Sequence, residues 1–376
     1  MASTQASVSS QIEQVLEALI FGDDLARAGN SMKSHSKRLD YLDLLRVLAL
    51  GSVITFHYFF NGISKGTVDS VSLPGFASIA KYGYLGVELF FLISGFVILY
   101  STQNRTAREF VKKRFIRLYP MYWMAIIVIY AITNLPYWSN KGPQLSKALW
   151  NLTMFPTAFG EEWVDAAHWF LARELQLYVF VTIVLAIGIG RHLPNIFSWW
   201  AIILCLWNLF DLPQFEIWYF SGYFALITGG AIIFSIREWG MNTLRGVSLL
   251  AAYICAVETR MTKSVALADH RNTTYNKYVV AILVTVGFLL IFATLNSHIS
   301  SISFKWAGIA GAITYPLFLV HGRLGLLSIQ NLANDSNKYL VYPLILIAVI
   351  AIAYGLLKLE KKLLATRLFT GKDGKS

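Results

Sequence analysis

Cysteine is nearly absent from this 376-residue chain, in which only Cys205 and Cys255 occur. Both lie inside apolar stretches, and their spacing fits neither a disulfide framework nor a cysteine-based metal site. Charged residues are also scarce, at 14% of the chain against about 25% in an average soluble domain. The composition therefore excludes a disulfide-stabilised secreted module and argues against an ordinary soluble protein.

Acidic residues are fewer than basic ones, 21 against 32, so the formal net charge is +11. A basic balance can indicate nucleic-acid binding, but here the basic residues fall in short loops between apolar runs. Cytoplasmic loops of a membrane protein explain this distribution better, and we expect no nucleic-acid partner. The sequence also lacks an internal repeat, a low-complexity region and a signal peptide, since residues 1–37 are polar without a basic segment leading into an apolar one.

Apolar residues, by contrast, make up 56% of the chain and cluster in runs of about 20 residues, the length that crosses a bilayer as a helix. In lipid the backbone must satisfy its own hydrogen bonds, so these runs predict helices. The predicted fold is an all-α integral membrane protein, a bundle of about ten transmembrane helices. The expected spans are residues 41–60, 84–100, 118–135, 169–190, 196–212, 216–236, 243–257, 277–295, 306–330 and 340–358.

Lysine and arginine give the orientation, because cytoplasmic loops carry an excess of both. Most of these residues fall inside when the N-terminus is cytoplasmic, and an even number of spans then returns the C-terminus to the same side. We therefore expect residues 1–37 to form a cytoplasmic tail with a possible short amphipathic helix, residues 38–358 a transmembrane domain, and residues 359–376 a basic cytoplasmic tail.

Ionisable residues inside several spans mark a candidate site, because such groups are costly in hydrocarbon. Arg46 and His57 are eleven residues apart in the first span, which is about 16 Å and about three helical turns, so they share one face. Counting the helical rise from each predicted span end places His57, Glu88, Glu174 and His321 at a similar depth in the outer half of the membrane.

On the cytoplasmic side, Arg46, Arg114 and Arg117 are expected to form a basic mouth. The planar guanidinium binds phosphate through two hydrogen bonds, so the mouth suits a phosphorylated ligand. Deeper in, His57 could take a proton from a hydroxyl, and Glu88 could orient its ring and stabilise its cation. The chain thus predicts an anion-binding mouth joined to a buried base.

Five motifs resemble the membrane acyltransferase-3 family, in the family's order. They are the Arg46–His57 pair, the second-span stretch GVELFFLISGF containing Glu88, the R-x-x-R of Arg114 and Arg117 followed by Leu118–Tyr119–Pro120, the stretch HWFLARELQLY with Trp169, Glu174 and Tyr178, and ITYPLFLVH with Tyr315, Pro316 and His321. Glu88, Thr314 and Phe318 replace the family's usual Asp, Ser and Tyr. The resemblance covers about residues 38–358.

The resemblance implies an O-acyltransferase, most simply an O-acetyltransferase, that uses cytoplasmic acyl-CoA such as acetyl-CoA as co-substrate. It further implies a hydroxyl of a surface polysaccharide, lipopolysaccharide or related glycan as acceptor. A bacterial inner membrane would then be the location, and glycan biosynthesis or export proteins would be partners. On this view His57 and Glu88 are catalytic, and Arg46, Arg114 and Arg117 bind the CoA phosphates. Glu174, His321, Tyr315 and Trp169 support the site or bind the acceptor, and no metal is expected.

Two other functions fit parts of the same pattern. A proton-coupled transporter would also bury His and Glu, although matched repeat halves with broken helices are expected there and are not found. A non-catalytic subunit of a glycan export assembly would share the membrane fold. Whether acyl transfer passes directly or through an acyl-enzyme is also left open by the sequence.

Overall fold

The computed structural model describes residues 40–138, 141–212 and 219–365, and these residues form helices joined by short loops with no β-strand among them. The predicted tail 1–37 lies outside this part of the chain. The helices are α3 Asp40–Phe56, α4 Gly62–Ser64, α5 Ala77–Ala80, α6 Gly86–Thr102, α7 Ala107–Thr133, α8 Leu145–Asn151, α9 Trp169–Ala186, α10 Leu193–Leu209, α11 Gly222–Trp239, α12 Thr243–Asp269, α13 Lys277–Phe292, α14 Ser297–Ser300, α15 Ala307–Leu332 and α16 Lys338–Ala365.

Seven stretches of the described chain are long and apolar enough to cross a membrane: Asp40–Ser64, Ala77–Thr102, Ala107–Thr133, Ala166–Ala186, Lys277–Leu295, Ala307–Leu332 and Lys338–Ala365. The other three expected spans correspond to α10, α11 and α12, which fall outside this set. The all-helical membrane fold is therefore confirmed, while the count of ten spans and the cytoplasmic position of both ends stay predictions.

The helix α12 is longer than the sequence indicated, and here the expected span 243–257 was wrong. Asn242 caps its N-terminus, where the Asn242 side chain accepts a hydrogen bond from the Arg245 backbone, and the helix runs for 27 residues from Thr243. The charged residues of its second half do not end it, because Arg260 finds a counter-charge on another helix. A buried ionisable group with a partner is compatible with a continuing helix.

α6 and α11 make the closest contact between two helices of the bundle. Every residue of α11 from Phe224 to Ile236 is buried, and the helix packs along α6 at a distance that only glycine permits at two positions. A Cβ at Gly95 would overlap the Ile227 carbonyl, and one at Gly230 would overlap the Leu92 carbonyl. In lipid the hydrophobic effect does not drive helices together, so their association depends on dispersion contacts. Small residues strengthen these contacts because they let two helices approach closely.

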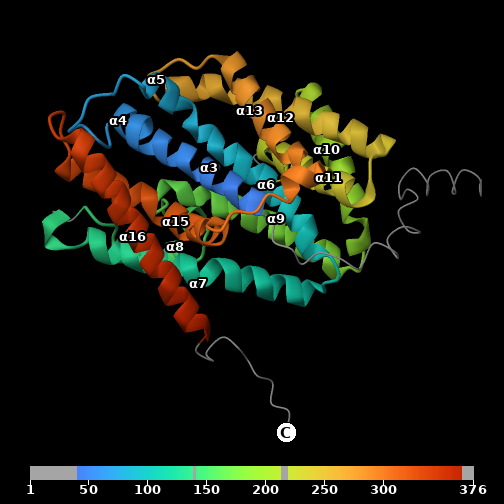
Figure 1. The fold of residues 1–376 in the computed structure, drawn as a ribbon, viewed down its shortest axis with the longest axis horizontal. Helices are drawn as coiled ribbons and strands as arrows, with labels where there is room; N and C mark the ends of the chain where they lie inside the picture. Colours follow the sequence, from blue (N-terminus) through green and yellow to red (C-terminus); the bar gives the residue numbers. More distant parts are fainter. Residues whose placement is uncertain (1–39, 139–140, 213–218, 366–376) are drawn as a thin grey trace, which may run out of the picture.

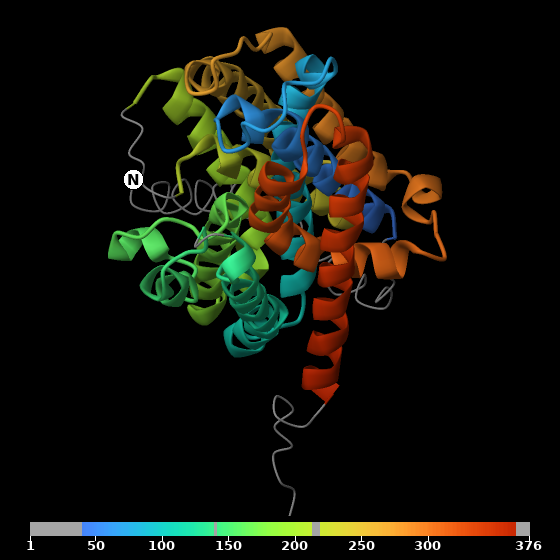
Figure 2. The same cartoon turned by 90° about the vertical axis from the view of Figure 1, so that its left-hand side faces the viewer.

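Figure 1 shows how the helices are arranged around α6. α3 and α6 run side by side through the middle, α10–α13 gather on one side, and α7, α8 and α16 lie on the other. In the perpendicular view, α16 runs along α15 and extends beyond the other helices at its C-terminal end (Figure 2).

The helix α7 starts at a capping box, in which Thr106 and Glu109 satisfy each other's backbone N–H groups.

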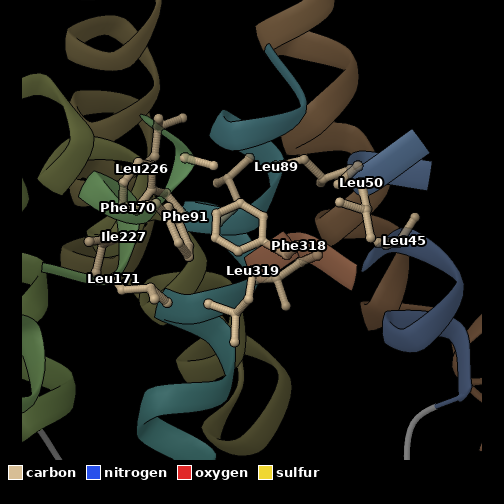
Figure 3. Packing of buried hydrophobic residues seen from close by; sticks show 14 of the residues in the cluster. Leu45, Leu50, Leu89, Phe91, Phe170, Leu171, Leu226, Ile227, Phe318 and Leu319 are labelled. Atoms are coloured by element: carbon tan, nitrogen blue, oxygen red, sulfur yellow. The ribbon is translucent and has the colours of Figure 1, made fainter. Parts of the chain in front are cut away.

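A layer of large apolar side chains joins α3, α6, α9, α11 and α15 (Figure 3). Phe91 of α6, Phe170 of α9 and Phe318 of α15 meet in this layer, with the Phe91 and Phe170 ring centroids 4.6 Å apart. Leu45 and Leu50 contribute from α3. The polar residues described next therefore sit on elements whose relative positions are set by close apolar packing.

Candidate functional site

Two histidines from helices far apart in the sequence face each other. His57 follows α3 and His321 lies in α15, and their ring centroids are 5.4 Å apart in an edge-to-face arrangement. His321 is fully buried, whereas His57 is partly exposed. The two elements approach closely because position 325 is glycine, where any Cβ would overlap the Tyr58 side chain. The Tyr58 hydroxyl donates a 2.9 Å hydrogen bond to the His321 carbonyl.

A π-helical turn, His57–Asn61, places the first histidine. The turn widens the helix after α3 and carries the chain on into α4. Single π-helical turns inside helices are rare and are frequently found at functional sites. Sequence patterning predicted a helix over residues 41–60 but gave no sign of this turn, since α and π turns have similar residue preferences.

A carboxylate and a third histidine complete the cluster, and sequence reasoning missed both. Asp165 is buried, and its Oδ atoms accept hydrogen bonds from the backbone N–H groups of Ala167 at 2.9 Å and Arg323 at 2.6 Å. His168 is fully buried with Nε2 2.8 Å from the Leu319 carbonyl. The D-x-x-H spacing directly before the motif at Trp169 was the available signal.

The charge of Asp165 reaches the histidines of the cluster, His57, His168 and His321. Burial raises the pKa of Asp165, but the neighbouring histidines and the two backbone N–H donors outweigh it, so the pKa lies below its ordinary value. Asp165 can come this near to α15 because residue 322 is glycine, where a Cβ would overlap the carboxylate. Asp165 is thus an ionised group that can stabilise an imidazolium.

The expected partnership of Glu88 with His57 needs correction. Glu88 Oε1 accepts a hydrogen bond from Arg260 Nη1 of α12 at 3.3 Å, and both side chains are buried. The Arg260 guanidinium also lies 4.2 Å from the Tyr223 ring centroid. Among the described residues no hydrogen bond joins Glu88 to His57. Depth counting located Glu88 along its helix, but it could not show which way the helix faces.

Trp169 belongs to the surroundings of this ion pair. Its ring contacts Phe91 and Tyr223, with centroids 6.0 Å and 5.0 Å apart, and Tyr223 in turn covers Arg260. The residue therefore packs in the layer between α6, α9 and α11. Its predicted role in supporting the site or binding the acceptor remains a prediction.

Glu174 also lies elsewhere than expected. It accepts a 2.5 Å hydrogen bond from Ser94 Oγ, about two turns along α6 from Glu88, and its charge reaches Arg46 and Arg114. Glu174 thus belongs to the arginine end of the bundle, not to the layer of His57. The four residues predicted at one depth divide into the histidine pair, the Glu88–Arg260 pair and a glutamate near the arginines.

The three arginines of the predicted basic mouth lie in one region, whereas their role in binding an anion stays a prediction. Arg117 is close enough to Arg46 and Arg114 for their charges to repel. Arg46 pairs with Asp43 at 2.6 Å, a partner that sequence reasoning did not single out. Arg114 is buried with its guanidinium 4.9 Å from the Tyr178 ring centroid, whereas Arg117 is exposed. Three guanidinium groups beside the carboxylates of Asp43 and Glu174 leave the region with a positive balance, which favours an anion.

Tyr315 connects the two ends of the site. It lies in α15 six residues before His321, and its hydroxyl donates a 2.9 Å hydrogen bond to the Leu118 carbonyl of α7. This bond ties α15 to the helix that carries Arg114 and Arg117. Tyr315 therefore fixes the helix of His321 against the helix of the two arginines.

Within residues 40–138, 141–212 and 219–365, no three His, Cys, Asp or Glu side chains are placed so that they could hold a metal ion. Comparison with known sequences adds one finding. The model of the acyltransferase-3 family, described as an acyltransferase domain, matches residues 39–358. No curated protein and no solved structure matches the chain.

Proposed function

Because the chain belongs to the acyltransferase-3 family and is a membrane acyltransferase, we propose that it transfers an acyl group from acyl-CoA to a hydroxyl of a surface glycan. The acyl group proposed is acetyl, and the acceptor is a surface polysaccharide, lipopolysaccharide or related glycan. The proposed location is a bacterial inner membrane, with glycan biosynthesis or export proteins as partners.

The observation that carries this proposal is the pairing of two clusters along α3. The partly exposed His57 faces the buried His321, and Arg46 lies about 16 Å away on the same helix, near Arg114 and Arg117. A donor with phosphates at one end and a thioester on a long arm fits this separation. The arginines hold the phosphates, and the thioester reaches the imidazoles.

The chain's own residues then divide the work. Guanidinium groups bind the phosphates through charge-assisted hydrogen bonds. One imidazole of the facing pair takes the proton of the attacking hydroxyl, a role that neutral histidine performs near physiological pH. Asp165 stabilises the cation that forms in the cluster, as carboxylates do in catalytic triads.

The test is transfer of labelled acetyl from acetyl-CoA to glycan in proteoliposomes, measured beside acetyl-CoA binding on the same preparation. We expect His57→Ala to lower transfer at least about 10²-fold, since this is the typical cost of losing either a proton-transfer group or a hydrogen-bond donor to the oxyanion. Binding should be nearly unchanged, because the phosphate contacts are remote from the ring. His298→Ala, at an exposed position, is the matched control.

Normal transfer by the His57→Ala protein would exclude a catalytic role for this residue. Wild-type protein that binds no acyl-CoA, but moves protons across the vesicle membrane, would favour a transporter instead. Wild-type protein with neither property would favour a non-catalytic subunit.

A further inference from the structure

Hydrogen bonds to a neutral imidazole decide which of its two nitrogens carries the proton, because each nitrogen is then either a donor or an acceptor. His57 and His321 each have one nitrogen whose neighbour is of fixed character. Their resting protonation can therefore be deduced, and with it the part that each ring is ready to play.

At His57 the deduction begins with Arg271, in the loop between α12 and α13. Its Nε–H donates to Asn61 Oδ1 at 2.8 Å. A guanidinium can only donate, so the oxygen of the Asn61 amide must face Arg271. The amide nitrogen then faces His57, with Nδ2 3.3 Å from Nδ1. An amide nitrogen can only donate, so Nδ1 of His57 holds a lone pair and Nε2 carries the proton.

At His321 the arrangement is the opposite. Its Nδ1 lies 2.8 Å from the Phe318 carbonyl oxygen, one turn earlier in α15. A carbonyl oxygen only accepts, so Nδ1 carries the proton and Nε2 holds a lone pair. Nε2 is buried and has no hydrogen-bond partner in the described part of the chain. A buried lone pair without a donor is costly unless something fills the site during function.

We propose, on the basis of the acyl transfer proposed above, that His321 Nε2 is the general base and that His57 Nε2–H binds the thioester carbonyl oxygen. Asn61 and Arg271 are positioning residues that hold His57 in the donor form. In this way the two facing rings are not equivalent, although either alone would pass for the base.

The step balances as follows. The acceptor hydroxyl oxygen forms a bond to the thioester carbon, and its proton passes to His321 Nε2. The carbonyl oxygen becomes an oxyanion and accepts a hydrogen bond from His57 Nε2–H. When the C–S bond breaks, the sulfur of CoA takes the proton back from His321. The products are the acyl ester and free CoA, and both rings return to their starting forms.

The charges around the two rings agree with this division. The groups whose charges reach His57 are Arg271, Lys65, Asp165 and His321, and the first two are cations that oppose its protonation. Around His321 the carboxylate of Asp165 favours the cation and His168 opposes it, and the Phe318 carbonyl holds the Nδ1 proton. A base must accept a proton, so the surroundings suit His321 for that part better than His57.

The decisive variant is Asn61→Asp, because a carboxylate of the same size only accepts. It keeps the contact with Arg271 but forces the proton of His57 onto Nδ1, leaving Nε2 without its donor. We expect transfer to fall about 10²–10³-fold, as when an oxyanion donor is removed, with acetyl-CoA binding unchanged. In protein labelled with ¹⁵N-histidine, the nuclear magnetic resonance spectrum should show the protonated nitrogen moving from Nε2 to Nδ1 on one ring. Asn331→Asp, at an exposed position, is the control.

If His57 were the base, Asn61→Asp would expose its lone pair at Nε2, and transfer would be maintained or rise; that result would overturn the assignment. So would transfer by His321→Gln at the wild-type rate, since this variant should lose about 10²–10⁴-fold. Wild-type protein that transfers no acyl group overturns the proposed function and this inference together. Active wild type with undiminished Asn61→Asp overturns only the inference.

Discussion

The Glu88–Arg260 pair shows how single residues are stabilised in this protein. Both side chains are about 95% buried, since only 6% and 5% of their surfaces are exposed. Each charge would cost several kcal/mol alone, so the pair is held together by the penalty of separating it more than by net attraction. Tyr223 adds a cation–π contact to Arg260. This arrangement indicates a role in joining α6 to α12.

We therefore predict that Glu88→Gln acts mainly through stability. Removing one partner of a buried pair typically costs about 3–5 kcal/mol, whereas replacing both with apolar residues is often neutral. Thermal unfolding in detergent should show a lower midpoint for Glu88→Gln and for Arg260→Met. The double variant Glu88→Leu with Arg260→Met should recover much of the loss. A Glu88→Gln protein that is as stable as wild type but inactive would contradict this prediction and support a catalytic role for Glu88.

The three arginines of the mouth differ from one another in their surroundings. Arg114 is buried against Phe110 and Tyr178, so its removal would also disturb packing. Arg117 is exposed and free of this complication. Arg117 thus offers the cleaner test of phosphate binding.

For Arg117→Ala we predict acyl-CoA binding weaker by about 10- to 150-fold, the equivalent of losing one charge-assisted hydrogen bond worth roughly 1.5–3 kcal/mol. Arg117→Lys should restore binding only in part, since the ammonium lacks the two-pronged geometry. Isothermal titration with purified protein measures the effect, and Arg108→Ala on the same helix is the exposed control. Equal acyl-CoA affinity in wild type and Arg117→Ala would show that Arg117 does not bind the phosphates. Its positive charge would then serve only to orient the protein in the membrane.

At the scale of elements, glycines determine which helices can approach. Gly95 and Gly230 bring α6 and α11 into backbone contact, and Gly325 brings α15 against Tyr58. These contacts hold α3, α6 and α15 in the arrangement that makes His57 and His321 meet. The geometry of the site thus depends on residues that carry no functional group.

Gly95→Leu should therefore destabilise the bundle, because its side chain would collide with the backbone at Ile227, which cannot move aside. Overpacking costs about 1–3 kcal/mol where side chains yield, and a backbone collision should exceed that range. Gly51→Leu is the control, since nothing lies within 4 Å of a Cβ there. The readout is the monodisperse fraction and thermal midpoint in detergent. Equal behaviour of the two variants would show that the α6–α11 contact is not essential.

At the scale of the whole molecule, the number of crossings depends on α10, α11 and α12. These helices correspond to three expected spans but lie outside the seven that length and apolarity identify. α11 is enclosed by its neighbours, so it does not need an apolar surface toward lipid, and α12 carries a charged half. Hydropathy alone is therefore a weak guide to these three helices.

The ten-span topology predicts that the two ends of α12 lie on opposite sides of the membrane. In a protein with Cys205 and Cys255 replaced, Met241→Cys should be labelled only from the cytoplasmic side and Asn272→Cys only from outside. Reporter fusions at residues 20 and 372 should both report cytoplasm. Labelling of both cysteines from one side would show that α12 does not cross the membrane. The placement of Arg46 on the cytoplasmic side and His57 on the outer side would then no longer follow from the ten-span topology.

The sequence by itself determined the all-helical membrane fold class and the approximate positions of most helices, and it predicted the three arginines of the mouth. Long apolar runs permit only helices in lipid, and R-x-x-R spacing keeps Arg114 and Arg117 on neighbouring turns. The sequence also placed His57 and His321 at a similar depth, because helical rise converts sequence position into depth, and the structure has the two rings facing each other.

Only the tertiary structure decided which partner each buried charge has. Depth along a helix is set by residue number, but facing depends on rotation and packing, which a single sequence does not reveal. Glu88 thus pairs with Arg260, and Glu174 accepts a hydrogen bond from Ser94. The carboxylate near the histidines is Asp165, which lies in a loop. The tertiary structure also decides which nitrogen of each imidazole carries the proton. At His57 this depends on Asn61, which lies in the π turn and is oriented by the distant Arg271, and at His321 it depends on the Phe318 carbonyl.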